Sequence, residues 1–154
     1  MENIILYSTL ITSITTLLTV IILIWQTVVT RKTAHAEFTL RLHDMFFINN
    51  NNSKIIRCLE NGESILTRNN GTFNKSDLDD YLGILELLAI YIDNGVLHKN
   101  TVKEMFGFYI RTTWTNSEIQ DYINSIKESE KTDKYYKQFK KLAIDLINDH
   151  NSGK

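Results

Sequence analysis

The sequence contains no proline, a single cysteine and only six glycines among its 154 residues. Proline is the strongest helix breaker, so its absence leaves the long amphipathic runs uninterrupted and predicts an all-α protein. The lone cysteine, Cys58, excludes an internal disulfide and fits a reducing compartment. A glycine-rich phosphate loop and a recognisable nucleophile motif are also missing from the sequence. We therefore predict neither an enzyme nor a cofactor.

Charge is missing from the N-terminal part of the chain. No charged residue lies between Glu2 and Arg31, and residues 4–30 are mostly apolar. At about 1.5 Å per residue, a helix over this segment is about 40 Å long, against a hydrocarbon core of about 30 Å. We predict a transmembrane helix over residues 1–30 and a cytosolic helical domain over residues 31–154.

The flanking charges predict the orientation of this span. Arg31 and Lys32 follow it, whereas only Glu2 precedes it, so the positive-inside rule places the C-terminal domain in the cytoplasm. The protein is then a single-pass protein of the inner (cytoplasmic) membrane with its N-terminus outside. The alternative is a signal peptide cleaved after residues 34–36, but the basic n-region is missing and the apolar run exceeds the usual h-region of about 7 to 15 residues.

Polar side chains recur along one side of the predicted span. The residues of this polar seam are Ser8, Thr12, Thr15, Thr19 and Gln26. A second row beside it consists of Thr9, Ser13 and Thr16. The hydroxyls either bond back to the carbonyl four residues earlier, or face identical helices and allow close approach. Gln26 favours the second interpretation, because its own backbone cannot satisfy its amide. We expect a homo-oligomer in the lipid bilayer, with a tetramer as one stoichiometry.

The domain after the span is electrically balanced. The chain has 18 acidic residues, of which Glu2 precedes the span, which leaves 17 against 17 Lys and Arg. A neutral domain is not a general nucleic-acid binder, so no nucleic-acid duplex is expected as a partner. The four histidines lack the i, i+3 or i+4 spacing of a helical metal site, so none is predicted.

Apolar periodicity predicts the course of the domain. Residues 31–48 continue the membrane helix without a break, which predicts one long rod. A bundle of five or six helices is the simplest architecture for the rest. The expected elements are a polar loop at 49–52, a short helix capped by Ser53 and ending at 61–62, a mobile loop at 68–75, a central helix from a capping box at 76–79 to Asn94-Gly95, and helices at 101–115, from 117, and at 133–148. Inward positions include Met105 and Tyr135.

Lysines and aromatic residues cluster near the C-terminus. Lysines 134, 137, 140 and 141 flank Tyr135 and Tyr136, a composition that can cradle phosphates and stack a base. The alternative is a solvated helix face, diluted by Asp133 and Asp145. In a symmetric oligomer, even one arginine per subunit makes a strong anion site. The candidate residues for binding a small anionic ligand are Arg41, Arg111, Trp114, Tyr136, Lys137 and His150.

Glu86 lies in the apolar segment LGILELLAIYI. It is either a buried acid with a raised pKa, which would suit a membrane-tethered hydrolase, or a structural carboxylate that is exposed or paired with Arg111. We favour the structural role, because such acids are rarely buried without a partner.

The second half of the chain resembles a known family. LDDYLGILELLAIYIDNGVLHKNTVKEMFGFYI at residues 78–110, then Trp114 and YYKQFKKL at 135–142, resemble a bacterial membrane-tethered helical domain of unknown function, with Gly83 in place of an expected asparagine. This resemblance implies a fold and a tether but no activity. By layout, the chain is also similar to the cyclic tetra-adenylate-responsive membrane effectors of type III CRISPR defence. This similarity in layout suggests an antiviral sensor-effector that binds a cyclic oligoadenylate and perturbs the membrane. A passive anchored scaffold that recruits a protein partner is the alternative.

Overall fold

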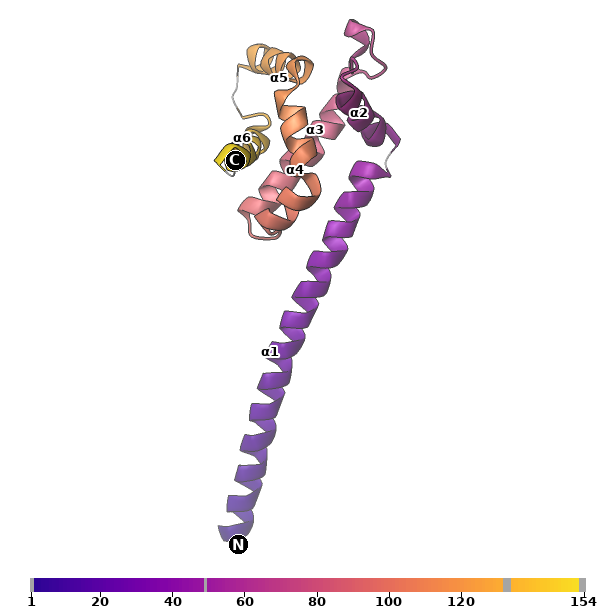
Figure 1. Ribbon diagram of the computed structural model, residues 1–154. Coiled ribbons are helices and arrows are strands. Elements are labelled where there is room, and N and C mark those ends of the chain that lie inside the picture. Colours follow the sequence, from indigo (N-terminus) through magenta and orange to yellow (C-terminus); the bar gives the residue numbers. More distant parts are fainter. Residues whose placement is uncertain (1, 49, 132–133, 153–154) are drawn as a thin grey trace. The chain divides into compact units, whose positions relative to one another are not determined.

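The computed structural model describes residues 2–48, 50–131 and 134–152, with the backbone alone for residues 2–6, 8, 35 and 50 (Figure 1). The helices are α1 (Glu2–Phe47), α2 (Asn50–Asn61), α3 (Lys75–Asp93), α4 (Lys99–Thr115), α5 (Ser117–Glu130) and α6 (Lys137–Ser152), with a short 3-10 helix η1 (Thr67–Asn69). The only β-type pairing in these residues is an isolated bridge between Leu66 and Phe73. The predicted fold class, a long apolar N-terminal helix followed by a helical bundle, is confirmed.

The chain divides into two compact units, Met1–Leu40 and Arg41–Lys154. In the first unit, α1 is apolar and uncovered by protein: Leu17 is 63% exposed and Trp25 is 65% exposed. By length and composition, the stretch Thr9–Phe47 is able to cross a membrane, because a window of 18 residues within it has a mean hydropathy of 1.9. Among the described residues, this is the one helix with that property.

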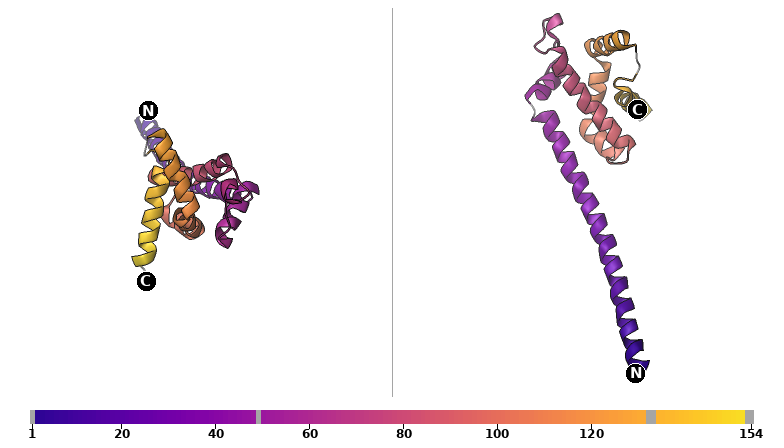
Figure 2. Two further views of the ribbon diagram at one scale, coloured as in Figure 1. Left: turned by 90° about the horizontal axis from the view of Figure 1, so that it is seen from above. Right: turned by 180° about the vertical axis from the view of Figure 1, so that it is seen from behind.

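In the second unit, α3 and α4 share the centre (Figures 1 and 2). α3 packs against α2 and α6, while α4 packs against α2, α5 and α6. Aromatic rings join three elements, since the Phe46 ring lies 6.0 Å from that of Tyr81 and 5.1 Å from that of Phe106. The Tyr81 hydroxyl is buried and shares a 2.8 Å hydrogen bond with the Thr113 hydroxyl, so this polar pair is satisfied inside the core.

The first helix after α1 begins earlier than predicted. Residues 50–52 belong to α2, although their asparagines predicted a loop, and Asn49 lies outside the described residues. Asn52 is buried, and its Nδ2 donates a 2.8 Å hydrogen bond to the Met45 carbonyl at the end of α1. The Asn51 amide donates to Asp77 at 3.1 Å. These partners lie outside α2 and stabilise asparagines that have low intrinsic helix propensity.

α3 also begins earlier than the sequence suggests. Its N-cap is Asn74, whose Oδ1 accepts the Asp77 N–H at 3.0 Å, while Asp77 Oδ2 accepts the Asn74 N–H at 3.0 Å. This is a capping box two residues before the one predicted at 76–79, because Asn74 and Asp77 have the same three-residue spacing. The predicted end of the helix at Asn94-Gly95 is confirmed, with Gly95 at φ 69°.

Replacement of Asn74 by alanine is expected to lower the free energy of unfolding by about 1 kcal/mol, because it leaves the Asp77 N–H group without its acceptor. Urea unfolding of the full-length protein in detergent micelles measures this change. Ser76→Ala, one residue inside the helix, is the control and is expected to change the free energy by less than about 0.5 kcal/mol. Equal effects of the two substitutions would contradict the assigned cap.

The segment predicted as a mobile loop is folded onto the bundle. Ile65, Leu66 and Phe73 are buried, and the Phe73 N–H donates to the Ile65 carbonyl at 2.9 Å. A side chain at Gly71 would approach the Ile65 carbonyl to 2.3 Å, so only glycine fits there. Glu118 of α5 accepts the Ile65 and Leu66 N–H groups at 2.8 and 2.9 Å. This carboxylate is more than 50 residues away in sequence, so local composition gave no sign of it.

The last helix begins at Lys137 instead of residue 133, and Asp133 itself lies outside the described residues. Tyr136 has φ 54° and therefore cannot be helical. Tyr135 thus precedes the helix, and the periodicity that predicted it to be buried does not apply; it is 45% exposed. Met105 of α4 is 38% exposed and was also wrongly predicted as core.

Candidate functional site

A cleft of about 560 Å³ lies beside the beginning of α6. Its cations come from α5, from the segment before α6 and from α6 itself: Lys127, Lys134, Lys137, Lys140 and Lys141. Its rings and aliphatic side chains are Trp114, Tyr135, Tyr136, Ile123 and Ile144. Among the described residues, no carboxylate lines this cleft. The cleft therefore attracts anions and offers aromatic surfaces to a flat group.

Two carboxylates of α3 position the beginning of α6. The Glu86 carboxylate accepts the N–H groups of Gln138 and Phe139 at 3.1 and 2.7 Å. The Tyr136 hydroxyl donates a 2.7 Å hydrogen bond to Asp79. Glu86 thus has the structural role that we favoured, but its partner is the N-terminus of α6 and not Arg111. Because both of its oxygens already bind backbone amides, the interactions of Glu86 are those of a helix cap.

Trp114 forms a wall of the cleft from α4. Its ring meets that of Phe139 edge to face, with centroids 5.5 Å apart and an angle of 81°. Its backbone carbonyl accepts a 2.7 Å hydrogen bond from the Gln120 side chain. Trp114 is half-buried, so its fluorescence is a natural reporter of the cleft.

The lysines of the cleft differ in their partners. Lys141 pairs with Asp93 at 3.1 Å. Lys137 and Lys140 are exposed and form no ion pair within the described part of the chain. A lysine ammonium is a flexible point charge, which suits phosphate groups without demanding one fixed geometry.

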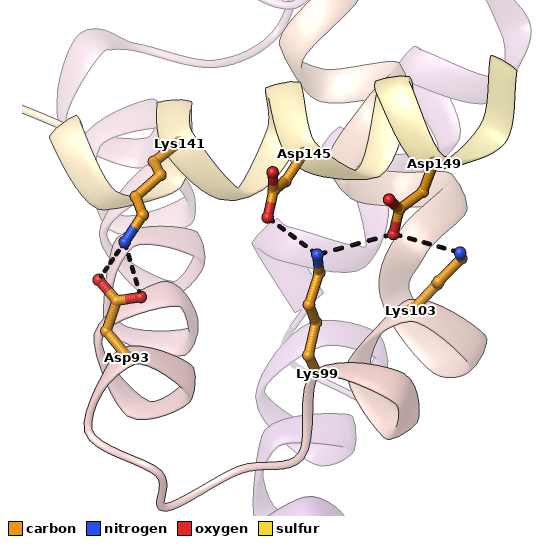
Figure 3. A network of polar contacts seen from close by, with 6 residues as sticks. All are labelled: Asp93, Lys99, Lys103, Lys141, Asp145 and Asp149. Carbon is orange, nitrogen blue, oxygen red and sulfur yellow. Dashed lines mark hydrogen bonds and ion pairs between the residues drawn. The ribbon is translucent and has the colours of Figure 1, made fainter. Parts of the chain in front are cut away.

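The acidic residues of α6 belong to a separate network (Figure 3). Lys99 of α4 binds Asp145 at 2.8 Å and Asp149 at 3.6 Å, and Lys103 binds Asp149 at 3.3 Å. The hydrogen bond to Asp145 raises the pKa of Lys99, and that from Lys103 lowers the pKa of Asp149. Asp145 therefore does not dilute the cleft lysines in the way that the sequence suggested, because it is engaged with α4.

Three of the six predicted ligand-binding residues line the cleft: Trp114, Tyr136 and Lys137. Arg41, Arg111 and His150 do not. Arg111 is half-buried, its guanidinium lies beside Gly107, and within the described residues its side chain has no hydrogen bond or ion pair. Sequence reasoning missed Ile123 and Lys127. Their spacing of four residues puts both on one face of α5. The local sequence gave no indication that this face lines the same cleft as α6.

In the first unit, two hydroxyls of the polar seam bond to their own helix. Thr15 and Thr19 donate to the carbonyls of Ile11 and Thr15 at 2.8 and 2.9 Å, as the back-bonding interpretation predicts. The side chain of Ser8 lies outside the described residues. The Gln26 amide, in contrast, makes no hydrogen bond to any described residue. A hollow on the helix is lined by Thr12, Ser13, Thr16, Leu17 and Val20, and thus touches both polar rows.

Cys58 is half-buried, and burial together with the nearby Glu63 carboxylate raises the pKa of its thiol. We expect iodoacetamide to alkylate the native protein at pH 8 at least about threefold more slowly than the urea-unfolded chain, because only the thiolate reacts. The folded protein holds the Cys58 proton more tightly than the unfolded chain does. The contribution of Cys58 to the free energy of unfolding is therefore complete below the ordinary thiol pKa, and it is lost as the pH rises through the raised pKa of the folded protein. Equal rates in the two states would contradict the prediction.

Comparisons with known proteins identify the family. The family model described as a domain of unknown function, DUF4760, matches residues 10–146. The match begins inside α1, so it extends well beyond the second half of the chain that carried the sequence resemblance. Neither the curated proteins nor the solved structures contain a match to the chain. Since the matched range covers most of its length, the chain belongs to the DUF4760 family.

Proposed function

We propose that this protein is a membrane-anchored sensor-effector whose helical domain binds a small, multiply charged anion in the cleft beside α6. The observation that carries the proposal is the convergence of five lysines and three aromatic rings on one cleft that no described carboxylate lines. Such a site binds phosphates through charge and a base or other flat group through stacking. It explains how an electrically balanced domain binds an anion locally.

The ligand that suits this cleft is a phosphate-bearing small molecule with a planar ring. The volume of about 560 Å³ lies in the usual range of small-molecule sites and suits a unit the size of a mononucleotide. A cyclic oligoadenylate is larger, so it would require clefts from several subunits around a symmetry axis. The sequence suggested a layout similar to that of the cyclic tetra-adenylate-responsive effectors, so we propose this messenger as the first to test, with antiviral defence as the role.

The effector part of the proposal is an oligomer of α1 in the lipid bilayer. The Gln26 amide has no partner in its own described chain, and the hollow beside Thr12 and Thr16 allows a second helix to approach closely. α1 is continuous in sequence to Leu42 and Phe46, which are buried in the core of the second unit. A rearrangement around these two residues therefore acts on the same helix that crosses the membrane. In this proposal the N-terminus is outside the inner membrane and the bundle is cytoplasmic.

The test is a melting-temperature panel on the full-length protein in detergent micelles. Pyrophosphate, tripolyphosphate, linear nucleotides and cyclic oligoadenylates are added in turn, and the mass of the protein is measured in parallel. A ligand that binds only the folded state raises the melting temperature by mass action, so we expect a selective rise with one phosphate-bearing ligand and an oligomeric mass. A flat panel with a monomeric mass would contradict the proposal and leave an anchored scaffold that recruits a protein partner.

A further inference from the structure

Two carboxylates of α3 hold the segment that begins α6. Asp79 and Glu86 are seven residues apart, which puts them on the same face of the helix, two turns from each other. Asp79 accepts the Tyr136 hydroxyl at 2.7 Å. Glu86 accepts the N–H groups of Gln138 and Phe139 at 3.1 and 2.7 Å. Three of the four residues from 136 to 139 are therefore bound to one neighbouring helix.

The backbone of this segment depends on those bonds. Tyr136 has φ 54°, in the left-handed region that residues with a Cβ disfavour. Its carbonyl still accepts the Lys140 N–H at 2.9 Å, so α6 begins directly from this conformation. Burial and the bond to Asp79 raise the pKa of the Tyr136 phenol, which therefore stays protonated and remains a donor. The bonds from α3 thus hold a conformation that the local sequence does not favour.

The same bonds determine how an anion is held. Helix N-termini commonly bind anions through their free N–H groups, but here Glu86 already occupies those of Gln138 and Phe139. An anion in the cleft must therefore bind to the lysine side chains instead of these backbone N–H groups. Two of those lysines, Lys137 and Lys140, lie in the turn that the α3 carboxylates fix.

We propose that Asp79 and Glu86 are positioning residues of the cleft, which fix the first turn of α6 so that Tyr136, Lys137 and Lys140 face a common ligand. The inference rests on the proposed function for the identity of the ligand. The positioning itself is measurable without any ligand, because Trp114 reports on the cleft and its ring contacts Phe139.

The experiment uses full-length protein in detergent micelles with Trp25→Phe, so that Trp114 is the only tryptophan. Quenching of its fluorescence by iodide and by caesium measures the local positive charge. The parent is expected to be quenched more strongly by iodide. Glu86→Asp keeps the negative charge but is one methylene too short to reach both N–H groups, and it is expected to reduce the iodide-to-caesium ratio at least about twofold. Tripolyphosphate affinity is expected to fall about fivefold.

Glu118→Asp is the matched control, because Glu118 also accepts two consecutive backbone N–H groups, but those of Ile65 and Leu66, in a segment that does not line the cleft. It is expected to lower the melting temperature in the same way and to leave the quenching ratio unchanged. A second pair of variants tests Asp79: Asp79→Asn keeps an acceptor for the Tyr136 hydroxyl and is expected to retain the ratio, whereas Asp79→Ala is expected to lose it.

The proposal is overturned if Glu86→Asp and Glu118→Asp give the same quenching ratio, or if Asp79→Asn and Asp79→Ala give the same quenching ratio. A parent that neither prefers iodide nor binds tripolyphosphate would instead contradict the proposed function. In that case hydrogen exchange decides the positioning: Glu86→Asp must accelerate exchange of the Gln138 and Phe139 amides about tenfold or more, and unchanged exchange overturns the inference.

Discussion

Replacement of both Lys137 and Lys140 by glutamine is expected to weaken tripolyphosphate or nucleotide binding by about 100-fold. A hydrogen bond to a charged group contributes about 1.5 to 3 kcal/mol, and two such losses at the lower end correspond to about two powers of ten in affinity. Both lysines are exposed and unpaired within the described residues, so the free energy of unfolding should change by less than about 0.5 kcal/mol. Isothermal titration calorimetry on the full-length protein measures the loss.

The control for this prediction removes the same number of charges elsewhere. Lys54 and Arg57 are exposed on α2 and do not line the cleft. Their joint replacement by glutamine lowers the net charge equally, so it should weaken binding by less than about threefold, through long-range electrostatics alone. If the two double variants behave alike, the net charge of the domain, and not the cleft, determines binding.

Substitution of Thr15, Thr19 and Gln26 by leucine is expected to shift the oligomer toward monomer by about 100-fold. Polar contacts between membrane helices contribute roughly 0.6 to 2 kcal/mol each, and leucine also prevents close approach of the backbones. The hydroxyls already bond within their own helix, so Gln26 should account for most of the loss. Mass measurement in detergent micelles and dye leakage from reconstituted vesicles check the oligomer and the membrane effect.

Replacement of Ile14, Ile21 and Val28 by leucine is the control for the seam variant. At about 100° per residue these positions lie on the opposite side of α1 from the seam, and all three are already aliphatic. We expect the mass and the leakage to stay the same. An unchanged oligomer in the seam variant, or an equal loss in both variants, would show that the helices associate through a different face.

Apolar periodicity was sufficient to predict the class of fold. Residues 4–48 carry a helical pattern without proline or charge in the span, and α1 follows it from Glu2 to Phe47. The predicted helix and loop boundaries were wrong where contacts with residues distant in sequence determine them. Asn52 joins α2 because it caps the Met45 carbonyl, and residues 65–73 fold because Glu118 binds their N–H groups. These contacts have no local sequence signal.

The candidate site was predictable in composition but not in geometry. The run of lysines around Tyr136 predicted an anion site, and these side chains line one cleft with Trp114. Two features of the site depend on which helices are neighbours in the fold. One is the contribution of Lys127 from α5, and the other is the hydrogen bonding of Asp79 and Glu86 to the beginning of α6. The left-handed backbone conformation of Tyr136 delays the start of α6, although no glycine or proline in the sequence marks that position.

The most direct test of anion binding in the cleft is a titration of Trp114 fluorescence in the full-length Trp25→Phe protein, reconstituted in lipid nanodiscs. Tripolyphosphate, ATP and cyclic tetra-adenylate are titrated into this protein and into the same protein with Lys137→Gln and Lys140→Gln. We predict a saturable change in fluorescence with at least one of these ligands, shifted by about 100-fold in the double variant. No saturable change with any ligand, or identical curves for the two proteins, would contradict the cleft as the ligand site.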